Sequence, residues 1–451
     1  MPAPPSLPRP CNVLLIGTGG REHALAWKLR QSPHLGELWV AGDANAGLAS
    51  LGRACPELID AKQMFRLQRW CDRESIHFVV VGPEAQLEQD FATLLASPTR
   101  KVFGPSRDAA RLEWDKAYAK QLMRSASIPT AEGRSFDHRE AALHYVEARG
   151  EAPLVVKASG LCAGKGVAVC SSREEAIAAV EQIMGARAFG DAGAQVVIEE
   201  RLTGQELSVL ALVDGRTISV LDPCQDHKQV GEGDVGPNTG GMGAYCPTPL
   251  ADEALMRLIE REVLVAAVDA LRREGSVFRG VLYAGIMLTP AGPKVLEFNT
   301  RFGDPETQPM MVRLQGDLLE LLWGTAAGEL DEVEYGFDER SACCVCVCSG
   351  GYPGPIVKGK VISGLRDAAA VPGVTLFHAG TSAAPNGDVV TSGGRVMGVT
   401  ALGASLAEAQ RAANQAASLI QFDGAFYRRD IGHRVLARGA AERVAPVRRE
   451  A

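Results

Sequence analysis

Val13-Leu14-Leu15-Ile16-Gly17-Thr18-Gly19-Gly20, residues 13–20, joins an apolar run to a glycine-rich turn. A helix is predicted directly after it, over residues 21–31. Further apolar runs at 38–40, 78–81 and 101–103 each end in a turn that contains glycine. Continuous apolar strands that alternate with amphipathic helices are typical of a parallel sheet buried between helices. We therefore predict a Rossmann-like N-terminal domain over residues 12–107, after a disordered leader over residues 1–11.

The turn at residues 17–20 is suited to a phosphate group, because backbone N–H groups at the start of a helix attract anions. The full dinucleotide-binding fingerprint is not met, since Glu22 stands where that pattern requires its third glycine. Three interpretations stay open for this turn: an NAD site, a site for a phosphate-bearing substrate, and a tight turn with a purely structural purpose.

From about residue 108 the pattern changes to α+β. Strands are predicted at 154–157 and 167–170, and the capping box Ser172-x-x-Glu175 indicates the start of the following helix. Residues 222–249 have no periodicity and hold six glycines between 231 and 243. A loop of this length inside a compact domain is usually functional or disordered. The rest of the chain is predicted to form an α+β module over residues 108–328, a small C-terminal α+β domain over 329–437 and a tail over 438–451.

The loop over residues 158–166 lies between two predicted strands, with Lys157 before it and Lys165 near its tip. It is not a Walker A loop, which requires GxxxxGK[ST] between a strand and a helix. A mobile glycine-rich flap over nucleotide phosphates, with lysine as a point charge, fits this pattern. The alternative is a flexible hairpin, which would not need both lysines.

Glu297-Phe298-Asn299 ends a predicted strand, so the side chains of Glu297 and Asn299 lie on the same face. Two oxygen ligands on one face suit a Mg²⁺ ion that carries phosphates. The eight histidines show no spacing typical of zinc, and no nucleophile signature such as Gly-x-Ser-x-Gly occurs. A covalent enzyme intermediate is therefore not expected.

Composition limits the class of protein. The 451 residues are 46% hydrophobic and 22% charged, as in a globular protein of two to four domains. A net charge of −7 argues against a nucleic-acid partner, and no apolar run is long enough to predict a membrane span. The chain has eleven cysteines and no recognisable signal peptide. Together these features indicate reduced thiols in the cytoplasm. Cys343 and Cys346 form a CxxC pair, but the surrounding run alternates like a strand, which favours buried core residues over a metal site.

Six motifs occur together in this chain. They are Gly-Gly-Arg-Glu-His-Ala (19–24), Val-Gly-Pro-Glu (81–84), Ala-Gly-Lys-Gly-Val (163–167), Gln-Asp-His-Lys (225–228), Gly-Pro-Asn-Thr-Gly-Gly-Met-Gly-Ala-Tyr (236–245) and Glu-Phe-Asn-Thr-Arg-Phe-Gly-Asp-Pro-Glu-Thr-Gln (297–308). In this order they closely resemble the glycinamide ribonucleotide synthetase (phosphoribosylamine–glycine ligase) family of ATP-grasp enzymes, over about residues 12–433. The last two motifs are specific to that family.

This resemblance implies that residues 108–328 form a two-lobed ATP-grasp module, with the smaller lobe at about 125–195. It also implies a reaction of purine biosynthesis, in which glycine is joined to 5-phosphoribosylamine through a glycyl phosphate while ATP becomes ADP and phosphate. The expected partners are these small molecules, with no nucleic acid and no membrane, and the expected state is a cytoplasmic monomer.

The resemblance also implies roles for individual residues. Lys116, Lys157, Gly164, Lys165 and Gly166 would hold the ATP phosphates, Glu199, Glu200 and Leu202 the adenine, and Glu206 the ribose hydroxyls. Glu297 and Asn299 would bind Mg²⁺ or Mn²⁺, and Arg301, Lys228 and Asp226 would act in catalysis. The other substrates would bind at Gly19, Gly20, Arg21, Gly82, Pro83, Glu84, Thr239, Gly240, Gly241, Met242 and Asp304.

The chain departs from the family pattern near the predicted flap. Ser159 and Cys162 stand where the family usually has Asp and Ala, and Trp114-Asp115 replaces a pair of small residues before Lys116. These departures affect the expected hydrogen bonds of the flap and the affinity for the nucleotide.

Two other functions stay open on the sequence alone. One is a different ATP-grasp carboxylate–amine ligase or carboxylase, which would require a different loop at residues 225–245. The other is a catalytically silent nucleotide-binding regulator, which the intact lysines and the predicted metal ligands argue against.

Overall fold

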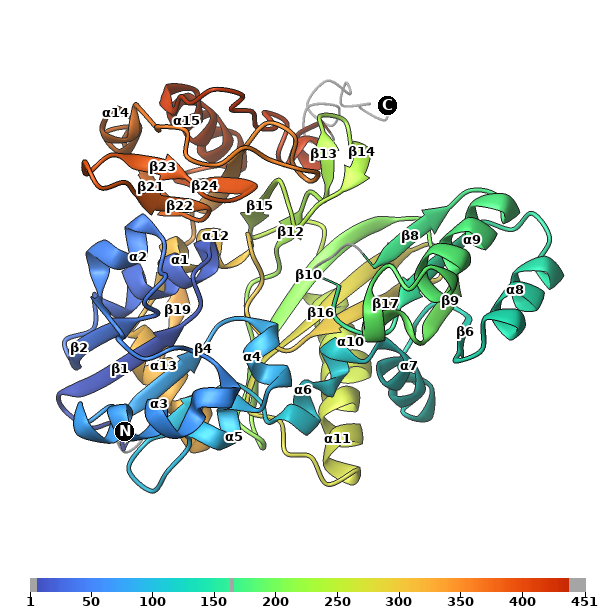
Figure 1. The fold of residues 1–451 in the computed structure, drawn as a ribbon, viewed down its shortest axis with the longest axis horizontal. Coiled ribbons are helices and arrows are strands. Elements are labelled where there is room, and N and C mark those ends of the chain that lie inside the picture. The colour runs from blue at the N-terminus through green and yellow to red at the C-terminus, as the bar shows by residue number, and fades with distance from the viewer. Residues whose placement is uncertain (1–5, 163–165, 438–451) are drawn as a thin grey trace, which may run out of the picture.

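The computed structural model describes residues 6–162 and 166–437 (Figure 1). Its N-terminal domain contains a five-stranded parallel sheet in the order β3-β2-β1-β4-β5. The strands are β1 (Cys11–Ile16), β2 (Leu35–Val40), β3 (Arg53–Ala54), β4 (Phe78–Val81) and β5 (Lys101–Phe103), and the helices are α1 (Gly20–Leu29), α2 (Ala46–Leu51), α3 (Met64–Arg73), α4 (Glu84–Glu88) and α5 (Phe91–Leu95). All four residues of β4 are buried, as expected for a strand covered on both faces. The predicted Rossmann-like domain is therefore confirmed.

The predicted disordered leader is wrong for the residues that the structure describes. Leu7 is buried in the core, and the backbone N–H and hydroxyl of Ser6 both donate to Glu329. The indole N–H of Trp323 donates to the Ser6 hydroxyl. Residues 6–10 are held by one apolar side chain and these polar contacts, which involve residues more than three hundred positions later and leave no local sequence pattern. Residues 1–5 and the predicted tail at 438–451 lie outside the described residues.

The larger lobe is built on an antiparallel sheet in the order β11-β10-β16-β17. Its strands are β10 (Gln205–Val213), β11 (Ile218–Val220), β16 (Gly280–Thr289) and β17 (Gly292–Asn299). The helices that accompany it are α6 (Arg107–Trp114), α7 (Lys116–Ser125), α10 (Glu253–Ile259) and α11 (Ala266–Arg273), with the π-helical turn η4 (Glu260–Val265) joining the last two. Apolar residues of α7, η4 and α11 share one core with the alternate residues of β10 and β16.

The smaller lobe has its own four-stranded sheet in the order β6-β9-β7-β8, and its own apolar core. It contains β6 (Gly133–Phe136), α8 (Arg139–Ala148), β7 (Leu154–Ala158), β8 (Val167–Cys170), α9 (Arg173–Val180) and β9 (Val196–Glu200). The hydroxyl of Ser172 caps α9 by accepting the N–H of Glu175, so the predicted helix start is confirmed.

The segment 222–249 corrects the sequence prediction of a loop without regular structure. It contains β12 (Gln225–Asp226), β13 (Gln229–Gly231), β14 (Val235–Asn238) and β15 (Gly243–Cys246). Strands β12 and β15 belong to the sheet of the C-terminal domain, in the order β12-β15-β20-β24-β21, and β13 and β14 form a separate hairpin. Strands of two to four residues are too short to show an alternating pattern, and the glycines between them hide it further.

The other strands of that C-terminal sheet are β20 (Ser341–Cys348), β21 (Val374–His378) and β24 (Arg395–Gly403), which helix α15 (Leu406–Leu419) covers. The four cysteines of β20 are buried and form no disulfide in the described part of the chain. They belong to the apolar core of this domain, so their interpretation as core residues is confirmed. None of the described helices is long and apolar enough to cross a membrane.

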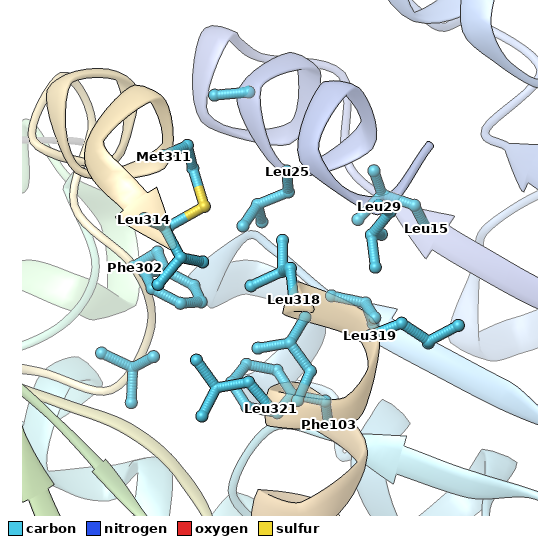
Figure 2. Packing of buried hydrophobic residues seen from close by; sticks show 14 of the residues in the cluster. Leu15, Leu25, Leu29, Phe103, Phe302, Met311, Leu314, Leu318, Leu319 and Leu321 are labelled. Atoms are coloured by element: carbon cyan, nitrogen blue, oxygen red, sulfur yellow. The ribbon is translucent and has the colours of Figure 1, made fainter. Parts of the chain in front are cut away.

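Two helices after β17 connect the domains, α12 (Thr307–Arg313) and α13 (Leu318–Ala327). Figure 2 shows Leu318, Leu319 and Leu321 packed between Leu25 of α1, Phe103 of β5 and Met311 of α12. The same cluster includes Leu210, Leu212 and Val281 from the larger lobe. The N-terminal sheet and the larger lobe therefore share one continuous core.

Candidate active site

Glu22 fills the space beside the glycine-rich turn that follows β1. A Cβ atom added to Gly17 or Gly19 would lie 2.6 or 2.8 Å from the Glu22 side chain, and one added to Gly82 would lie closer still. Glu22 also accepts the N–H of Gly19 at 2.8 Å. In a dinucleotide site, the glycines leave this space to the pyrophosphate. The glycines here instead make room for a carboxylate, which argues against the NAD interpretation.

A cavity of about 320 Å³ lies between this turn and the C-terminal domain. Three of its walls come from the turn, from the start of α2 and from the hairpin that follows β21. The residues that line it are Thr18, Gly19, Gly20, Asp43, Asn45, Asp304, Ala379, Gly380, Thr381, Ser392 and Arg395. Gly19, Gly20 and Asp304 were predicted to bind substrate, and the structure brings them together.

Arg395 connects this cavity to the segment at residues 239–242. Its guanidinium donates to the carbonyl oxygens of Gly240 and Asp304, both at 2.7 Å, and lies 3.5 Å from the carboxylate of Asp304. Burial opposes ionisation of Asp304, but Arg395 and Arg21 outweigh it and lower the pKa of this carboxyl. No local sequence pattern identifies Arg395, because its neighbours in space come from distant segments.

Other predicted substrate residues lie elsewhere. The guanidinium of Arg21 is buried and turned back, donating to Glu22 at 2.6 Å and to the carbonyl of Phe302 at 2.9 Å. Gly82 packs against Glu22, and Pro83 precedes the first turn of α4. Glu84 lies 3.3 Å from Arg301, so the turn at residues 82–84 borders the Arg301 cluster and not the cavity.

Arg301 lies at the centre of that cluster. Its guanidinium pairs with Glu113 at 2.9 Å and with Glu84 at 3.3 Å, and donates to the side-chain oxygen of Asn299 at 3.2 Å. Glu113 also accepts the backbone N–H of Thr300 at 2.7 Å. Burial opposes the charge of Arg301, but Glu113 and Glu84 outweigh it and raise the pKa of the guanidinium. Arg301 is thus a fixed positive charge next to the predicted metal ligands.

Glu297 lies among positive charges at the end of β17. Lys228 approaches its carboxylate at 3.9 Å. Burial opposes ionisation, but the charges of Lys228, Lys116, Lys157 and Arg301 outweigh it and lower the pKa of Glu297. Four of the cations that the sequence singled out thus favour the ionised form of this carboxylate.

Lys228 also pairs with Glu206 at 3.0 Å, so one ammonium connects the predicted ribose ligand to the predicted metal ligand. The carboxylate of Glu206 raises the pKa of Lys228, although burial opposes this effect. The carbonyl of Lys228 accepts the backbone N–H and the hydroxyl of Thr239, at 2.8 and 2.7 Å. Gly241 donates to the Thr239 hydroxyl and Met242 to the carbonyl of His227, so residues 239–242 fold back over Lys228.

A second buried acid, Glu306, was not assigned a role from the sequence. The hydroxyls of Tyr283 and Ser208 donate to it at 2.6 and 3.0 Å. Burial and the negative charge of Glu306 raise the pKa of Asp226 well above its usual value. Two carboxylic acids from distant parts of the chain thus interact in one low-dielectric region, which is a common arrangement for acid–base groups.

Glu199 forms ion pairs with two lysines where the two lobes meet. Lys157 lies 2.6 Å and Lys120 lies 2.7 Å from its carboxylate, and all three side chains are buried. Burial opposes ionisation of Glu199, but the two lysines lower its pKa. Lys120 was missed in the sequence. Its spacing of four residues from Lys116 was the available signal, because residues four apart share one helix face.

The remaining predicted nucleotide residues surround this junction. The ammonium of Lys116 lies 3.5 Å from the carbonyl of Gly160, at the base of the predicted flap. The carbonyl of Gly166 accepts the N–H of Ala158, whereas Gly164 and Lys165 lie outside the described residues. Glu200 pairs with Lys294 at 2.9 Å, and Leu202 lies in the connection between β9 and β10.

Comparison with known protein families gives three matches that together cover most of the chain. The N, ATP-grasp (A) and C domains of phosphoribosylglycinamide synthetase match residues 11–113, 114–307 and 342–434.

Curated relatives match at high coverage. The chain is 46% identical over 432 residues to a phosphoribosylamine–glycine ligase from Rhodopirellula baltica, covering 94% of this chain and 98% of that one. It is 47% identical to the enzyme of that name from Pseudomonas aeruginosa, covering 96% and 100%. Among solved structures, a phosphoribosylamine–glycine ligase from Thermotoga maritima superposes with a TM-score of 0.78 and 31% identity, covering 93% of this chain and all of that one.

Proposed function

The chain belongs to the phosphoribosylglycinamide synthetase family, and from this premise we propose how its residues carry out the reaction. It is an ATP-dependent carbon–nitrogen ligase of the ATP-grasp type and acts in purine biosynthesis as a phosphoribosylamine–glycine ligase. The observation that carries the proposed site is the group of cations at the end of β17. Lys228 lies 3.9 Å from the carboxylate of Glu297, Lys157 donates to the carbonyl of the preceding residue, Leu296, at 2.9 Å, and Arg301 donates to Asn299 at 3.2 Å.

In the proposed mechanism, the glycine carboxylate attacks the γ-phosphorus of ATP, giving glycyl phosphate and ADP. The amine of phosphoribosylamine then attacks the glycyl carbonyl, the C–N bond forms, phosphate leaves and the amine loses a proton. Negative charge develops on phosphoryl oxygens in both steps. Fixed cations that are already in place stabilise that charge without reorganisation, and no side-chain nucleophile is needed.

The ATP phosphates are assigned to Lys116 and Lys157, under the flap at residues 158–166. Glu199 holds Lys157 in place through its ion pair of 2.6 Å, so its main contribution is to position that lysine. We assign the adenine to the connection from Glu200 to Leu202, together with Glu199, and the ribose hydroxyls to Glu206. Lys228 pairs with Glu206, which keeps that carboxylate beside Glu297.

Glu297 and Asn299 fit a divalent cation. Both are oxygen donors from the end of one strand, and the lowered pKa of Glu297 keeps it ionised at neutral pH. Such a cation, Mg²⁺ or Mn²⁺, would neutralise phosphoryl charge when bound with ATP. Arg301 orients Asn299 through its hydrogen bond of 3.2 Å.

Phosphoribosylamine is assigned to the cavity between the N-terminal turn and the C-terminal domain. Within the described residues, the backbone N–H groups of Thr18 and Gly20 donate to no acceptor, and both residues line this cavity. Backbone N–H groups at a helix start suit a phosphate, and Arg395 supplies a positive charge in the same wall. Asp304, which is ionised, faces the same space and suits hydroxyl or amine groups.

Asp226 is the proposed acceptor of the amine proton. Its raised pKa, which burial and Glu306 cause, makes it a stronger base than an ordinary carboxylate. The remaining proposals concern the state of the enzyme. All eleven cysteines are free, which supports a reducing cytoplasm, and we propose that the enzyme acts there as a monomer.

The function is tested by ADP release with each amino acid in turn, phosphoribosylamine and a divalent metal, followed by mass spectrometry of the product. We expect ADP to form only with glycine, together with a product of the mass of glycinamide ribonucleotide. Release of ADP with another carboxylate or with bicarbonate, and none with glycine, would assign the chain to another branch of the ATP-grasp ligases.

Gly20→Ala tests the assignment of the phosphoribosyl group. A methyl added there lies 2.8 Å from the Gln308 amide nitrogen and 3.3 Å from the Ala379 methyl, at the wall of the cavity. We expect the apparent Michaelis constant for phosphoribosylamine to rise about tenfold, the scale of one lost hydrogen bond to a charged group. The constant for ATP should stay within twofold. Gly336→Ala is the matched control, because its added methyl meets nothing within 4 Å. An increase confined to the ATP constant would contradict the assignment.

A further inference from the structure

The first turn of α7 is capped by two residues from different parts of the chain. The N–H of Tyr118 donates to the Asp115 carboxylate at 3.0 Å, as in an ordinary N-cap. The N–H of Lys116 donates to the carbonyl of Ser159, and the N–H of Ala117 donates to the hydroxyl of Ser159, both at 3.0 Å. Ser159 therefore satisfies two of the N–H groups that a helix start leaves unpaired.

The two capping residues also bind each other. The hydroxyl of Ser159 donates to the same oxygen of Asp115, Oδ1, at 2.9 Å. Ser159 is only 6% exposed, so this bond lies away from water. The other oxygen of Asp115 pairs with Arg111 at 2.8 Å, on the more exposed side. The side-chain oxygens of Ser159 and Asp115 thus all take part in hydrogen bonds or ion pairs. Loss of either side chain would leave buried N–H or oxygen atoms of the first turn of α7 without a partner.

This contact crosses between the two lobes. Leu122 and Met123 of α7 belong to the core of the larger lobe, whereas Val156 and Ala158, just before Ser159, belong to the core of the smaller lobe. Ser159 and Gly160 are also fixed within the smaller lobe, by backbone bonds of 2.9 Å to Gln195 and 3.0 Å to Ala192. The start of the predicted flap is therefore attached to both lobes.

The contact also determines which groups at the start of α7 are available to bind a ligand. The N–H groups of residues 116–118 are all taken by Ser159 and Asp115. The start of α7 therefore has no free N–H group there for a phosphate, and only the side chain of Lys116 remains to act. The direction of that side chain depends on the first turn from which it projects.

We propose that Asp115 and Ser159 form an inter-lobe cap that positions Lys116 against the base of the flap, so that Lys116 and Lys157 act on the same nucleotide phosphates. This inference rests on the ATP site of the proposed function. Asp115 and Ser159 are positioning residues, because they touch Lys116 and the flap and not the reacting atoms. Both stand at positions where the sequence resemblance indicates a departure from the family pattern, and their side chains are in direct contact.

The test compares Ser159→Ala with Ser172→Ala. Ser172 caps α9 within the smaller lobe alone, so its loss removes a hydroxyl cap without affecting an inter-lobe contact. For Ser159→Ala we expect the apparent constant for ATP to rise about tenfold and kcat to fall, with the glycine constant within twofold. Ser172→Ala should match the wild type in all three. Without nucleotide, we expect Ser159→Ala to melt at a lower temperature than Ser172→Ala, because it leaves the buried N–H of Ala117 without a partner and removes one of the hydrogen bonds that Asp115 accepts.

A double substitution provides the rescue. Asp115→Ser with Ser159→Asp exchanges the hydroxyl and the carboxylate, and serine is itself a preferred N-cap. The exchange removes the ion pair between Asp115 and Arg111. The Arg111 side chain is 46% exposed, and an ion pair at such a site contributes little to stability. We expect the double variant to recover most of the ATP affinity that Ser159→Ala loses.

Three results would overturn the inference: an ATP constant within twofold of wild type for Ser159→Ala, an equal loss in Ser172→Ala, or no recovery in the double variant. Wild-type protein that fails to bind ATP would instead refute the proposed function, and the inference with it. The wild-type measurement therefore separates the two failures.

Discussion

Glu297→Gln is expected to lower turnover by at least about 10²-fold, the scale of losing one charged transition-state contact. The substitution keeps the size of the side chain and removes only its charge. That charge lies between Lys228, Lys116, Lys157 and Arg301, and these cations hold it ionised. A neutral amide keeps an oxygen ligand, as Asn299 does, but lacks the negative charge that a carboxylate offers to a divalent cation that carries phosphates. The measurement is glycine-dependent ADP formation at saturating ATP across a range of Mg²⁺ and Mn²⁺ concentrations.

The matched control is Glu253→Gln, on the exposed side of α10, where the carboxylate pairs with Arg257. It should leave turnover unchanged. If Glu297→Gln retained turnover within threefold of wild type, the metal assignment would be wrong. A large loss that excess metal partly reverses would support the assignment further, because it would place the defect in binding of the cation.

Arg301→Met is expected to destabilise the folded protein by about 3–5 kcal/mol, the usual cost of breaking a buried ion pair from one side. Glu113 is 7% exposed and pairs with Arg301 at 2.9 Å, so the substitution leaves a buried carboxylate without its cation. Burial then favours the protonated acid, and the pKa of Glu113 already lies above its usual value for that reason. The melting temperature should fall on the order of 10 °C, and activity should be lost.

The second substitution Glu113→Gln, in the Arg301→Met background, distinguishes lost charge from lost packing. A neutral amide can still interact with Thr300, so most of the stability should return while activity stays absent. The urea midpoint and the thermal melt of the single and double variants give the coupling energy. Equal melting temperatures for Arg301→Met and wild type would show that the Arg301 cluster contributes nothing to stability.

The parts of the fold that the sequence predicted well are those with continuous apolar runs. The strands at 78–81 and 101–103 are found at the predicted residues, because full burial on both faces leaves a pattern that needs no partner to be recognised. Glu297 and Asn299 could be placed together at the end of one strand for a similar reason, since their spacing alone puts them on one face of it; their role as metal ligands stays a prediction. A local sequence pattern was sufficient to place a residue when its position depends only on the strand or helix that contains it.

Prediction failed where the partner is distant in sequence. Arg395 binds carbonyls of Gly240 and Asp304, and Glu306 interacts with Asp226, and none of these pairs leaves a local signal. The segment at 222–249 was predicted as a loop because its strands are short, and two of them, β12 and β15, belong to a sheet whose other members lie more than ninety residues later. The purpose of the glycines at 17, 19 and 82 was also hidden, because it depends on the three-dimensional position of Glu22.

The shared core in Figure 2 has a consequence for the order in which the protein is made. The N-terminal sheet is complete once β5 has been synthesised, yet Leu318, Leu319 and Leu321, which cover one of its faces, come more than two hundred residues later. At about 5–20 residues per second, the ribosome needs on the order of ten seconds or more to supply them. During that time Leu25 and Phe103 lack the helix that buries them. The nascent N-terminal domain therefore has to wait for α13, or be shielded by a chaperone, before its apolar face is covered.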